Sequence, residues 1–170
     1  GDPLTNPGKD SPCKQCPIGT YTPGERAFGS CLTCPDGQYN GALNASVCLD
    51  CLAGEHSQAS KTSCVPCEAG KATNSARQSE CTECPPGQFT PTQSIDNKLC
   101  SPCGEGKFAD VKFSSFCTNC TIGKANAATG QDRCTDCTPG TFADREGLVV
   151  CDTCPPGKEA PFTVDPGPIT

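Results

Sequence analysis

The feature that most constrains the fold is a cysteine motif that recurs along almost the whole chain. Its first copy reads Cys13-Lys14-Gln15-Cys16-Pro17-Ile18-Gly19-Thr20-Tyr21, that is, Cys-x-x-Cys-x-x-Gly followed by a polar and an aromatic residue. A fixed period of this kind marks a tandem array of small units, none of which buries a core alone. Nine copies follow one another at intervals of 16 to 19 residues, and they begin at Cys13, Cys31, Cys48, Cys64, Cys81, Cys100, Cys117, Cys134 and Cys151.

The cysteines take the place of an ordinary hydrophobic core. Hydrophobic residues, cysteine included, make up only 34% of the 170 residues, and the chain has no Trp or Met. That leaves too little apolar volume for one globular core of normal density. Eighteen cysteines in so short a chain are typical of a disulfide scaffold, which forms in an oxidising compartment. We therefore expect a protein that is secreted, extracellular or exposed on the cell surface.

Each unit is expected to be two short strands joined by a turn. The glycine three residues after the second cysteine is present in all nine copies, which indicates a positive φ or a backbone with no room for a Cβ. The residues between one motif and the next are mostly small and polar, as in a loose hairpin. Such units are too small to be stable alone, so we expect an extended rod in which each repeat touches only its neighbours.

The favoured disulfide scheme joins the second cysteine of one copy to the first cysteine of the next. Bonding within one Cys-x-x-Cys makes a tight ring suited to redox chemistry, and no thioredoxin-like strand–helix frame surrounds any copy. In the favoured scheme each disulfide closes a loop of 12 to 15 intervening residues, and each stabilises the folded chain by roughly 3 kcal/mol. The eight pairs are Cys16–Cys31, Cys34–Cys48, Cys51–Cys64, Cys67–Cys81, Cys84–Cys100, Cys103–Cys117, Cys120–Cys134 and Cys137–Cys151.

This scheme leaves Cys13 and Cys154 over, one at each end of the array. We expect them to pair with further copies of the motif, either in a longer chain or head-to-tail between molecules. A competing scheme bonds adjacent motifs by two bridges, as in Cys13–Cys31 with Cys16–Cys34, and the sequence leaves both schemes open.

The segment from Cys16-Pro17-Ile18-Gly19-Thr20-Tyr21 to Cys31 resembles the single-disulfide loop that opens modules of the tumour necrosis factor receptor family. The uninterrupted run is more similar to ephrin-receptor-like cysteine-rich repeats, which belong to the growth-factor-receptor cysteine-rich group. Long arrays of such repeats also occur in ciliate surface antigens and in flagellar-hair proteins of protists and algae. The resemblance implies a small disulfide-rich fold, an array of short EGF- or receptor-like β-hairpins forming a rod or solenoid.

The resemblance does not select one function, because receptors, coats and fibres all use these repeats. The chain also departs from tumour necrosis factor receptor modules, which carry extra crossing disulfides, since it has only two cysteines per period. The acidic pattern of calcium-binding EGF modules is absent, so no calcium and no other cofactor is expected.

Zinc is the main alternative role for the cysteines, because paired Cys-x-x-Cys motifs at this spacing occur in zinc ribbons. Nine pairs do not fill four-coordinate sites evenly, and we favour disulfides. His56 is the only histidine and occupies an aromatic position of the motif, so we expect it to pack rather than to catalyse. No Ser-His-Asp or Cys-His set is available without it. We expect no enzyme.

Two sequons, Asn44-Ala45-Ser46 and Asn119-Cys120-Thr121, predict N-glycosylation at Asn44 and Asn119. The net charge of −6 and the lack of a basic, aromatic-rich patch argue against nucleic acid. No apolar run has the roughly 20 residues needed to span a bilayer.

The organisation we expect is a Pro/Gly-rich linker over residues 1–12, the repeats over 13–158 and a Pro-rich tail over 159–170. Near-identical repeats with an unmatched cysteine at each end favour a structural building block of an extracellular filament, flagellar hair or surface coat. The expected partners are other copies, neighbouring repeats of a longer chain, and glycans. The alternative is a receptor ectodomain or stalk, whose only candidate ligand loop is the longer spacer Phe89–Leu99, with Ile95 and Leu99.

Overall fold

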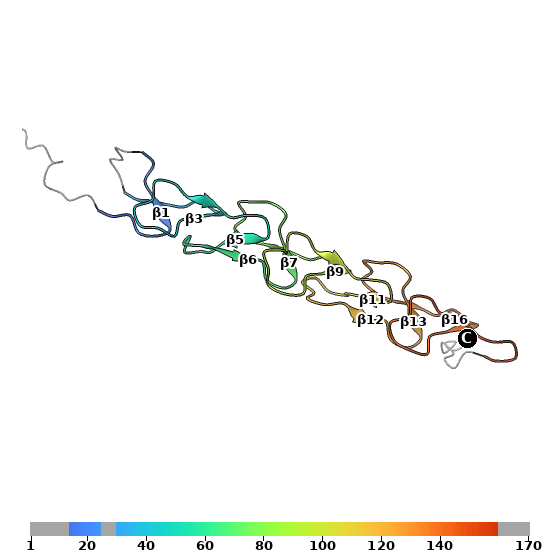
Figure 1. Ribbon diagram of the computed structural model, residues 1–170. Coiled ribbons are helices and arrows are strands. Elements are labelled where there is room, and N and C mark those ends of the chain that lie inside the picture. Colours follow the sequence, from blue (N-terminus) through green and yellow to red (C-terminus); the bar gives the residue numbers. More distant parts are fainter. Residues whose placement is uncertain (1–13, 25–29, 160–170) are drawn as a thin grey trace, which may run out of the picture.

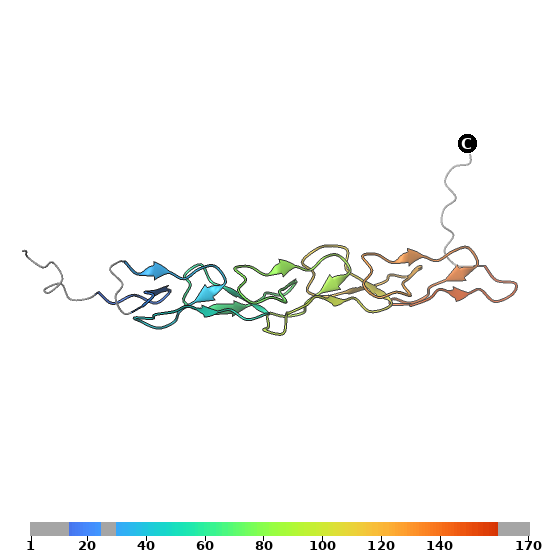
Figure 2. The ribbon, with the colours of Figure 1, turned by 90° about the horizontal axis from the view of Figure 1, so that it is seen from above.

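The structure is a computed structural model that describes residues 14–24 and 30–159. It is a long, thin rod in which successive repeats follow one another from the blue to the red end (Figure 1). The view from above has the same elongated outline, and the hairpins face different sides of the rod as the chain advances (Figure 2). The predicted fold class, a disulfide-rich array of short hairpins, is confirmed.

The described residues form eight separate two-stranded antiparallel sheets and no helix. Each sheet pairs two consecutive strands, so every hairpin is local in the chain. The pairs are β1 (Thr20–Tyr21) with β2 (Leu32–Thr33), β3 (Gln38–Tyr39) with β4 (Leu49–Asp50), β5 (Glu55–Ser57) with β6 (Cys64–Pro66), β7 (Lys71–Ala72) with β8 (Thr82–Glu83), β9 (Gln88–Phe89) with β10 (Ser101–Pro102), β11 (Lys107–Phe108) with β12 (Thr118–Asn119), β13 (Lys124–Ala125) with β14 (Thr135–Asp136), and β15 (Thr141–Phe142) with β16 (Asp152–Thr153).

The motif explains where each strand begins. The first strand of a hairpin starts directly after the motif glycine, and the second is formed by the two residues between the next pair of cysteines, as in β1 and β2. A tight turn precedes each first strand; in the first repeat the Thr20 amide donates to the Pro17 carbonyl at 3.2 Å. The motif glycines close these turns with positive φ between 71° and 89°, a region that glycine enters at no steric cost.

Eight disulfides close the loops. They join Cys16–Cys31, Cys34–Cys48, Cys51–Cys64, Cys67–Cys81, Cys84–Cys100, Cys103–Cys117, Cys120–Cys134 and Cys137–Cys151, the pairs of the favoured scheme. We number the loops as repeats 1 to 8 in this order. Cys154 has no disulfide partner among the described residues, and Cys13 lies outside them.

Among the described residues, the interior of the rod consists of cysteines and small or polar side chains, with Leu148 as the one large apolar residue that is buried. The second cysteine of each motif is buried from Cys16 to Cys120, and five of them are fully buried. A second buried row lies three residues after the motif glycine, at Asn40, Ser57, Thr73, Thr90, Ala109, Asn126 and Ala143. We call this row the clamp position.

Each repeat is bonded to the next through its backbone. The amide of Gly19 donates to the carbonyl of Asn40 at 2.7 Å, and the amide of Gly123 donates to that of Ala143 at 3.0 Å. The same bond, from a motif glycine to the clamp position of the following repeat, recurs at Gly54, Gly70, Gly87 and Gly106. In the second repeat the Gly37 amide donates to the Ser57 hydroxyl instead, at 3.0 Å.

The expectation that each repeat touches only its neighbours is wrong, because contacts also reach the second neighbour. A Cβ built on Gly37 of repeat 2 would overlap the backbone of Arg77 in repeat 4. The same relation, from repeat n to repeat n+2, holds for Gly19, Gly54, Gly70, Gly87 and Gly106. The period alone did not reveal this contact, since it depends on how the hairpins wind around the rod.

The expected linker, residues 1–12, lies outside the described residues, and so does the expected tail apart from Glu159.

Candidate functional site

The single histidine lies in strand β5, opposite Val65. It is half-buried, and its Nδ1 is buried with no hydrogen-bond partner. Together with Glu68, Lys71 and Glu80 it lines a small cavity of about 170 Å³. The one sulfur there belongs to Cys81, which is disulfide-bonded, so this cavity offers His56 no thiol or hydroxyl nucleophile to activate.

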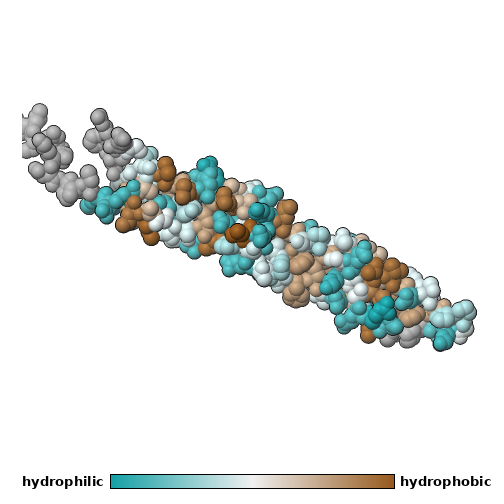
Figure 3. Space-filling view, viewed as in Figure 1, coloured by the Kyte–Doolittle hydropathy of each residue, from teal (hydrophilic) through white to brown (hydrophobic). Residues whose placement is uncertain are grey.

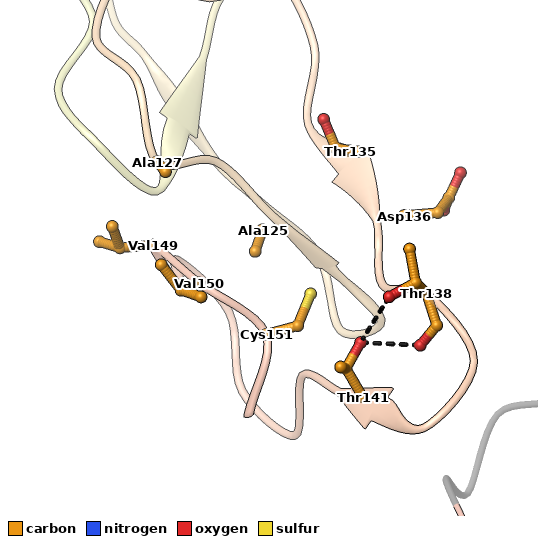
Figure 4. Close-up of a pocket in the computed structure, with 9 residues that line it drawn as sticks. All are labelled: Ala125, Ala127, Thr135, Asp136, Thr138, Thr141, Val149, Val150 and Cys151. Carbon is orange, nitrogen blue, oxygen red and sulfur yellow. Dashed lines mark hydrogen bonds between the residues drawn. The ribbon is translucent and has the colours of Figure 1, made fainter. Parts of the chain in front are cut away.

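A larger hollow of about 320 Å³ lies between β13, β14 and β15 (Figure 4). It forms over Ala125, which stands where five other copies of the motif have Tyr or Phe. Its polar groups come from three threonines and one carboxylate, and the Thr141 hydroxyl donates to the Thr138 carbonyl at 2.7 Å. Hydroxyls and methyls hold a ligand by hydrogen bonds and apolar contact, but they supply no acid–base pair. The residues around it are Ala125, Ala127, Thr135, Asp136, Thr138, Thr141, Val149, Val150 and Cys151.

Among residues 14–24 and 30–159, no group of three or more His, Cys, Asp or Glu is placed to hold a metal ion. Sixteen cysteines are in disulfides, and zinc requires thiolates. The zinc alternative therefore has no ligand set within these repeats.

The longer spacer Phe89–Leu99 is part of the stack. The backbone of Ile95 packs against Gly54 of repeat 3, and the buried Asn97 side chain donates to the carbonyls of Thr92 at 2.6 Å and Cys67 at 3.1 Å. The side chains of Ile95 and Leu99 point outward and are 54% and 69% exposed. Part of this spacer therefore holds repeats together, while two apolar side chains remain available to a partner.

The clamp position is a site that the motif analysis missed. The amide side chain of Asn40 donates to the Thr20 carbonyl at 2.8 Å, and that of Asn126 donates to the Lys107 carbonyl at 2.9 Å. The Thr90 hydroxyl makes the same bond to Lys71 at 3.3 Å. Each bond reaches back to the first strand of the preceding repeat. The signal in the sequence was a small or polar residue at a fixed offset from every motif glycine.

Ion pairs also link different repeats, one between neighbours and one between the hairpin β3–β4 of repeat 2 and repeat 4. Lys61, whose side chain is only 12% exposed, binds the Asp36 carboxylate at 2.5 Å, and the Arg77 guanidinium binds Asp50 at 2.8 Å. Asp50 also accepts a hydrogen bond from Gln38 at 2.6 Å. The hydrogen bonds from Gln38 and then Arg77 lower the pKa of Asp50 below its ordinary value.

The two sequon asparagines lie in different settings. Asn44 is exposed with φ +59°, and its side-chain oxygen accepts the Cys16 amide at 3.2 Å. Asn119 lies in strand β12, with its side chain beside Gly147. Asn44 and Asn119 remain predicted N-glycosylation sites.

Large apolar side chains are exposed in patches scattered among polar ones on the visible face (Figure 3). Within residues 14–24 and 30–159 the chain forms no helix capable of crossing a membrane. The exposed apolar residues are Ile18, Leu32, Leu43, Val47, Leu49, Leu52, Ile95, Leu99, Val111, Phe113, Phe116, Ile122, Val149 and Val150.

The chain was compared with known protein families, and the result agrees with the repeated disulfide hairpins of the structure. The sequence model described as tyrosine-protein kinase ephrin type A/B receptor-like matches residues 5–51, 54–98 and 123–164, which make up most of the chain. No curated protein matches the chain. The disulfides and the family fit an extracellular or cell-surface protein of receptor or structural type. The chain belongs to the ephrin-receptor-like family of cysteine-rich repeats.

Proposed function

We propose that the chain is a structural building block of an extracellular filament, flagellar hair or cell-surface coat. The observation that carries the proposal is the continuity of the repeat contacts. Backbone bonds link each repeat to the next, and the glycine contacts reach from repeat 1 to repeat 8. A rod built in this way is long and stiff. Each repeat extends it without forming a binding site that differs from those of the other repeats.

An oxidising location outside the cell is part of this proposal. Eight disulfides at roughly 3 kcal/mol each replace the missing hydrophobic core, so the rod depends on bonds that a reducing cytosol would remove.

The proposal includes no enzymatic activity. His56 is the only histidine in the chain, and its cavity offers carboxylates and one lysine but no thiol or hydroxyl for it to activate. The hollow at Ala125 is lined by hydroxyls, methyls and a single carboxylate. Neither arrangement contains a Ser-His-Asp or Cys-His set.

A receptor ectodomain or stalk is the second candidate. It is supported by the family match and by the exposed side chains of Ile95 and Leu99. In a receptor, Leu99→Asp would abolish ligand binding; in a filament it would leave assembly nearly unchanged. Val111→Asp, at another exposed apolar residue in the next repeat, is the matched control.

Electron microscopy of the oxidised chain tests the proposal. Filaments with a regular axial repeat, lost on reduction, are expected. Separate rods at every concentration would contradict a filament and favour a receptor stalk.

A further inference from the structure

The clamp residue of repeat 2, Asn40, is followed directly by Gly41. Asparagine is chemically labile, because the backbone nitrogen of the next residue can attack its side-chain carbonyl carbon. Glycine leaves this attack unhindered, since it has no Cβ beside the attacking nitrogen. Asn126, the other asparagine in the clamp row, is followed by Ala127 instead. The two clamps therefore differ in the residue that controls how readily the asparagine reacts.

The closed clamp fixes the side chain of Asn40. Its Nδ2 donates to the carbonyls of Thr20 at 2.8 Å and Ala42 at 3.0 Å, and its Oδ1 accepts from the Ala42 amide at 3.0 Å. Only 5% of the residue is exposed. The side chain has to leave these partners before its Cγ can rotate onto the Gly41 nitrogen. The reaction therefore requires the clamp to open.

The backbone of Asn40 connects three repeats. Its carbonyl accepts from the Gly19 amide of repeat 1 at 2.7 Å, and its amide donates to the Lys61 carbonyl of repeat 3 at 2.9 Å. The disulfide Cys34–Cys48 closes the loop that contains Asn40. A change of charge or of backbone length at this residue therefore acts on the junctions of repeat 2 with both of its neighbours.

We propose that Asn40-Gly41 is a deamidation site under the control of the clamp: the closed stack protects it, and deamidation makes an opening permanent. This inference does not depend on the proposed filament function. The Gly41 nitrogen forms a bond to Cγ of Asn40, the Cγ–Nδ2 bond breaks, and ammonia leaves with the amide proton. The product is a cyclic succinimide. Water then opens one of its two bonds to the ring nitrogen; opening at Cγ gives aspartate, and opening at the backbone carbonyl gives isoaspartate.

Neither product restores the clamp. A carboxylate has no proton to donate, so the oxygen that replaces Nδ2 would face the carbonyls of Thr20 and Ala42, both of which are acceptors. A buried charge in such surroundings is costly. Isoaspartate adds a methylene group to the backbone, and the bonds to Gly19 and Lys61 then lose their present spacing. A transient opening thus becomes a lasting one.

Mass mapping of the full oxidised chain, incubated at mildly alkaline pH, follows the reaction. Peptides in which Asn40 has become aspartate or isoaspartate are expected to accumulate, while Asn126 reacts much more slowly. Reduction of the disulfides should speed the conversion of Asn40 ~10-fold or more, because the closed clamp no longer limits it. Ala127→Gly, at an exposed residue, should make Asn126 as labile as Asn40 in the reduced chain and leave it protected in the oxidised one.

Opening one loop at a time separates the clamp from a general effect of disulfide loss. Cys34→Ser with Cys48→Ser opens the loop around Asn40 and should move its conversion rate toward that of the reduced chain. Cys103→Ser with Cys117→Ser opens a loop of the same length in repeat 6, with a sequence separation of 14 in both cases. This second pair is the matched control and should leave the rate at Asn40 unchanged.

The variant Asn40→Asp reproduces one product without the reaction. Hydrogen exchange of the Gly19 amide, which donates to the carbonyl of residue 40, should be ~10-fold faster or more in this variant, because the junction opens more often. Asn74→Asp, at an exposed residue, is the control and should leave the exchange of Gly19 unchanged.

Any of four results would overturn the proposal. They are the absence of conversion at Asn40 in the oxidised chain, equal rates in the oxidised and reduced chains, equal effects of the two disulfide removals, and unchanged exchange of Gly19 in Asn40→Asp. Conversion of Asn126 as fast as that of Asn40 in the reduced wild-type chain would also overturn it, because the following glycine would then have no effect.

Discussion

Gly87 in repeat 5 lies so close to Gly130 in repeat 7 that a Cβ on Gly87 would overlap the carbonyl group of Gly130. Two repeats that share no disulfide are thus in backbone contact. Gly87 therefore has two reasons to be glycine, a positive φ of 83° and a neighbouring backbone that leaves no room for a Cβ. The contact also stiffens the rod, since a bend between repeats 5 and 6 must disturb repeat 7.

Gly87→Ala should destabilise the array more than Gly140→Ala. Both glycines have positive φ, 83° and 84°, so both variants bear a left-handed penalty of about 1–2 kcal/mol. Only Gly87 is covered, and overpacking should add about 1–3 kcal/mol. Hydrogen exchange of the Ala109 and Gly130 amides, which are bonded across repeats, is the readout. Equal loss of protection there in the two variants would contradict the second-neighbour contact.

Asn126→Ala should weaken the bond between repeats 6 and 7. The variant leaves the Lys107 carbonyl without the donor that now lies 2.9 Å away, at a cost of about 1–3 kcal/mol. Chemical denaturation followed by local hydrogen exchange measures the loss. Asn74→Ala, at an exposed residue, is the control and should have almost no effect; a similar loss in both would argue against a clamp.

Removing a central disulfide should divide the rod, whereas removing the last one should only fray its end. Cys67→Ser with Cys81→Ser, and Cys137→Ser with Cys151→Ser, open loops of the same length, a sequence separation of 14. Chain entropy predicts roughly 3 kcal/mol for each. Limited proteolysis should then cut the first variant within repeat 4 and the second only near its C-terminal end. Identical cleavage maps would be evidence against a linear stack.

Acid should remove the contribution of Asp50 to the stability of the fold. Its pKa is lowered by the hydrogen bonds from Gln38 and Arg77, so its stabilisation is present above the ordinary aspartate pKa of about 4 and disappears as the pH falls through the lowered value. The melting temperature of the wild-type chain should therefore exceed that of Asp50→Asn at pH 7 and approach it near pH 2. A difference that grew on acidification would contradict this sign.

Expression through a secretory pathway should place N-linked glycans on Asn44 and Asn119. Deglycosylation in ¹⁸O water converts each occupied asparagine to a labelled aspartate, which mass spectrometry identifies. Ser46→Ala and Thr121→Ala remove the two sequons one at a time and serve as controls. Unmodified peptides at both positions would show that these sequons are not used.

The hairpins were predictable because residues close together in the sequence specify each one. The glycine sets the turn, the next two residues form one strand, and the residues between the following cysteines form the other, as in β1 and β2. The disulfide pairs of the structure are those of the favoured scheme, which the sequence did not separate from the competing one; a bridge such as Cys16–Cys31 closes the ends of one hairpin.

The stacking of the repeats could not be predicted in the same way. A period fixes how many units there are but not how they wind, so the contact of Gly37 with Arg77 has no local signal. The clamp position was missed because Asn126 and Ala143 share only small size and burial. The contacts by which Ile95 and Asn97 hold the longer spacer in the stack have no local signal either.

Small-angle X-ray scattering of the oxidised chain, at a dilution where single copies dominate, distinguishes a disulfide-stapled rod from a compact fold. A stapled rod predicts a radius of gyration well above the value of about 16 Å expected for a globular chain of this length, with a linear cross-sectional Guinier region. A radius of gyration near that value, with a globular scattering profile, would contradict the rod and every function proposed from it.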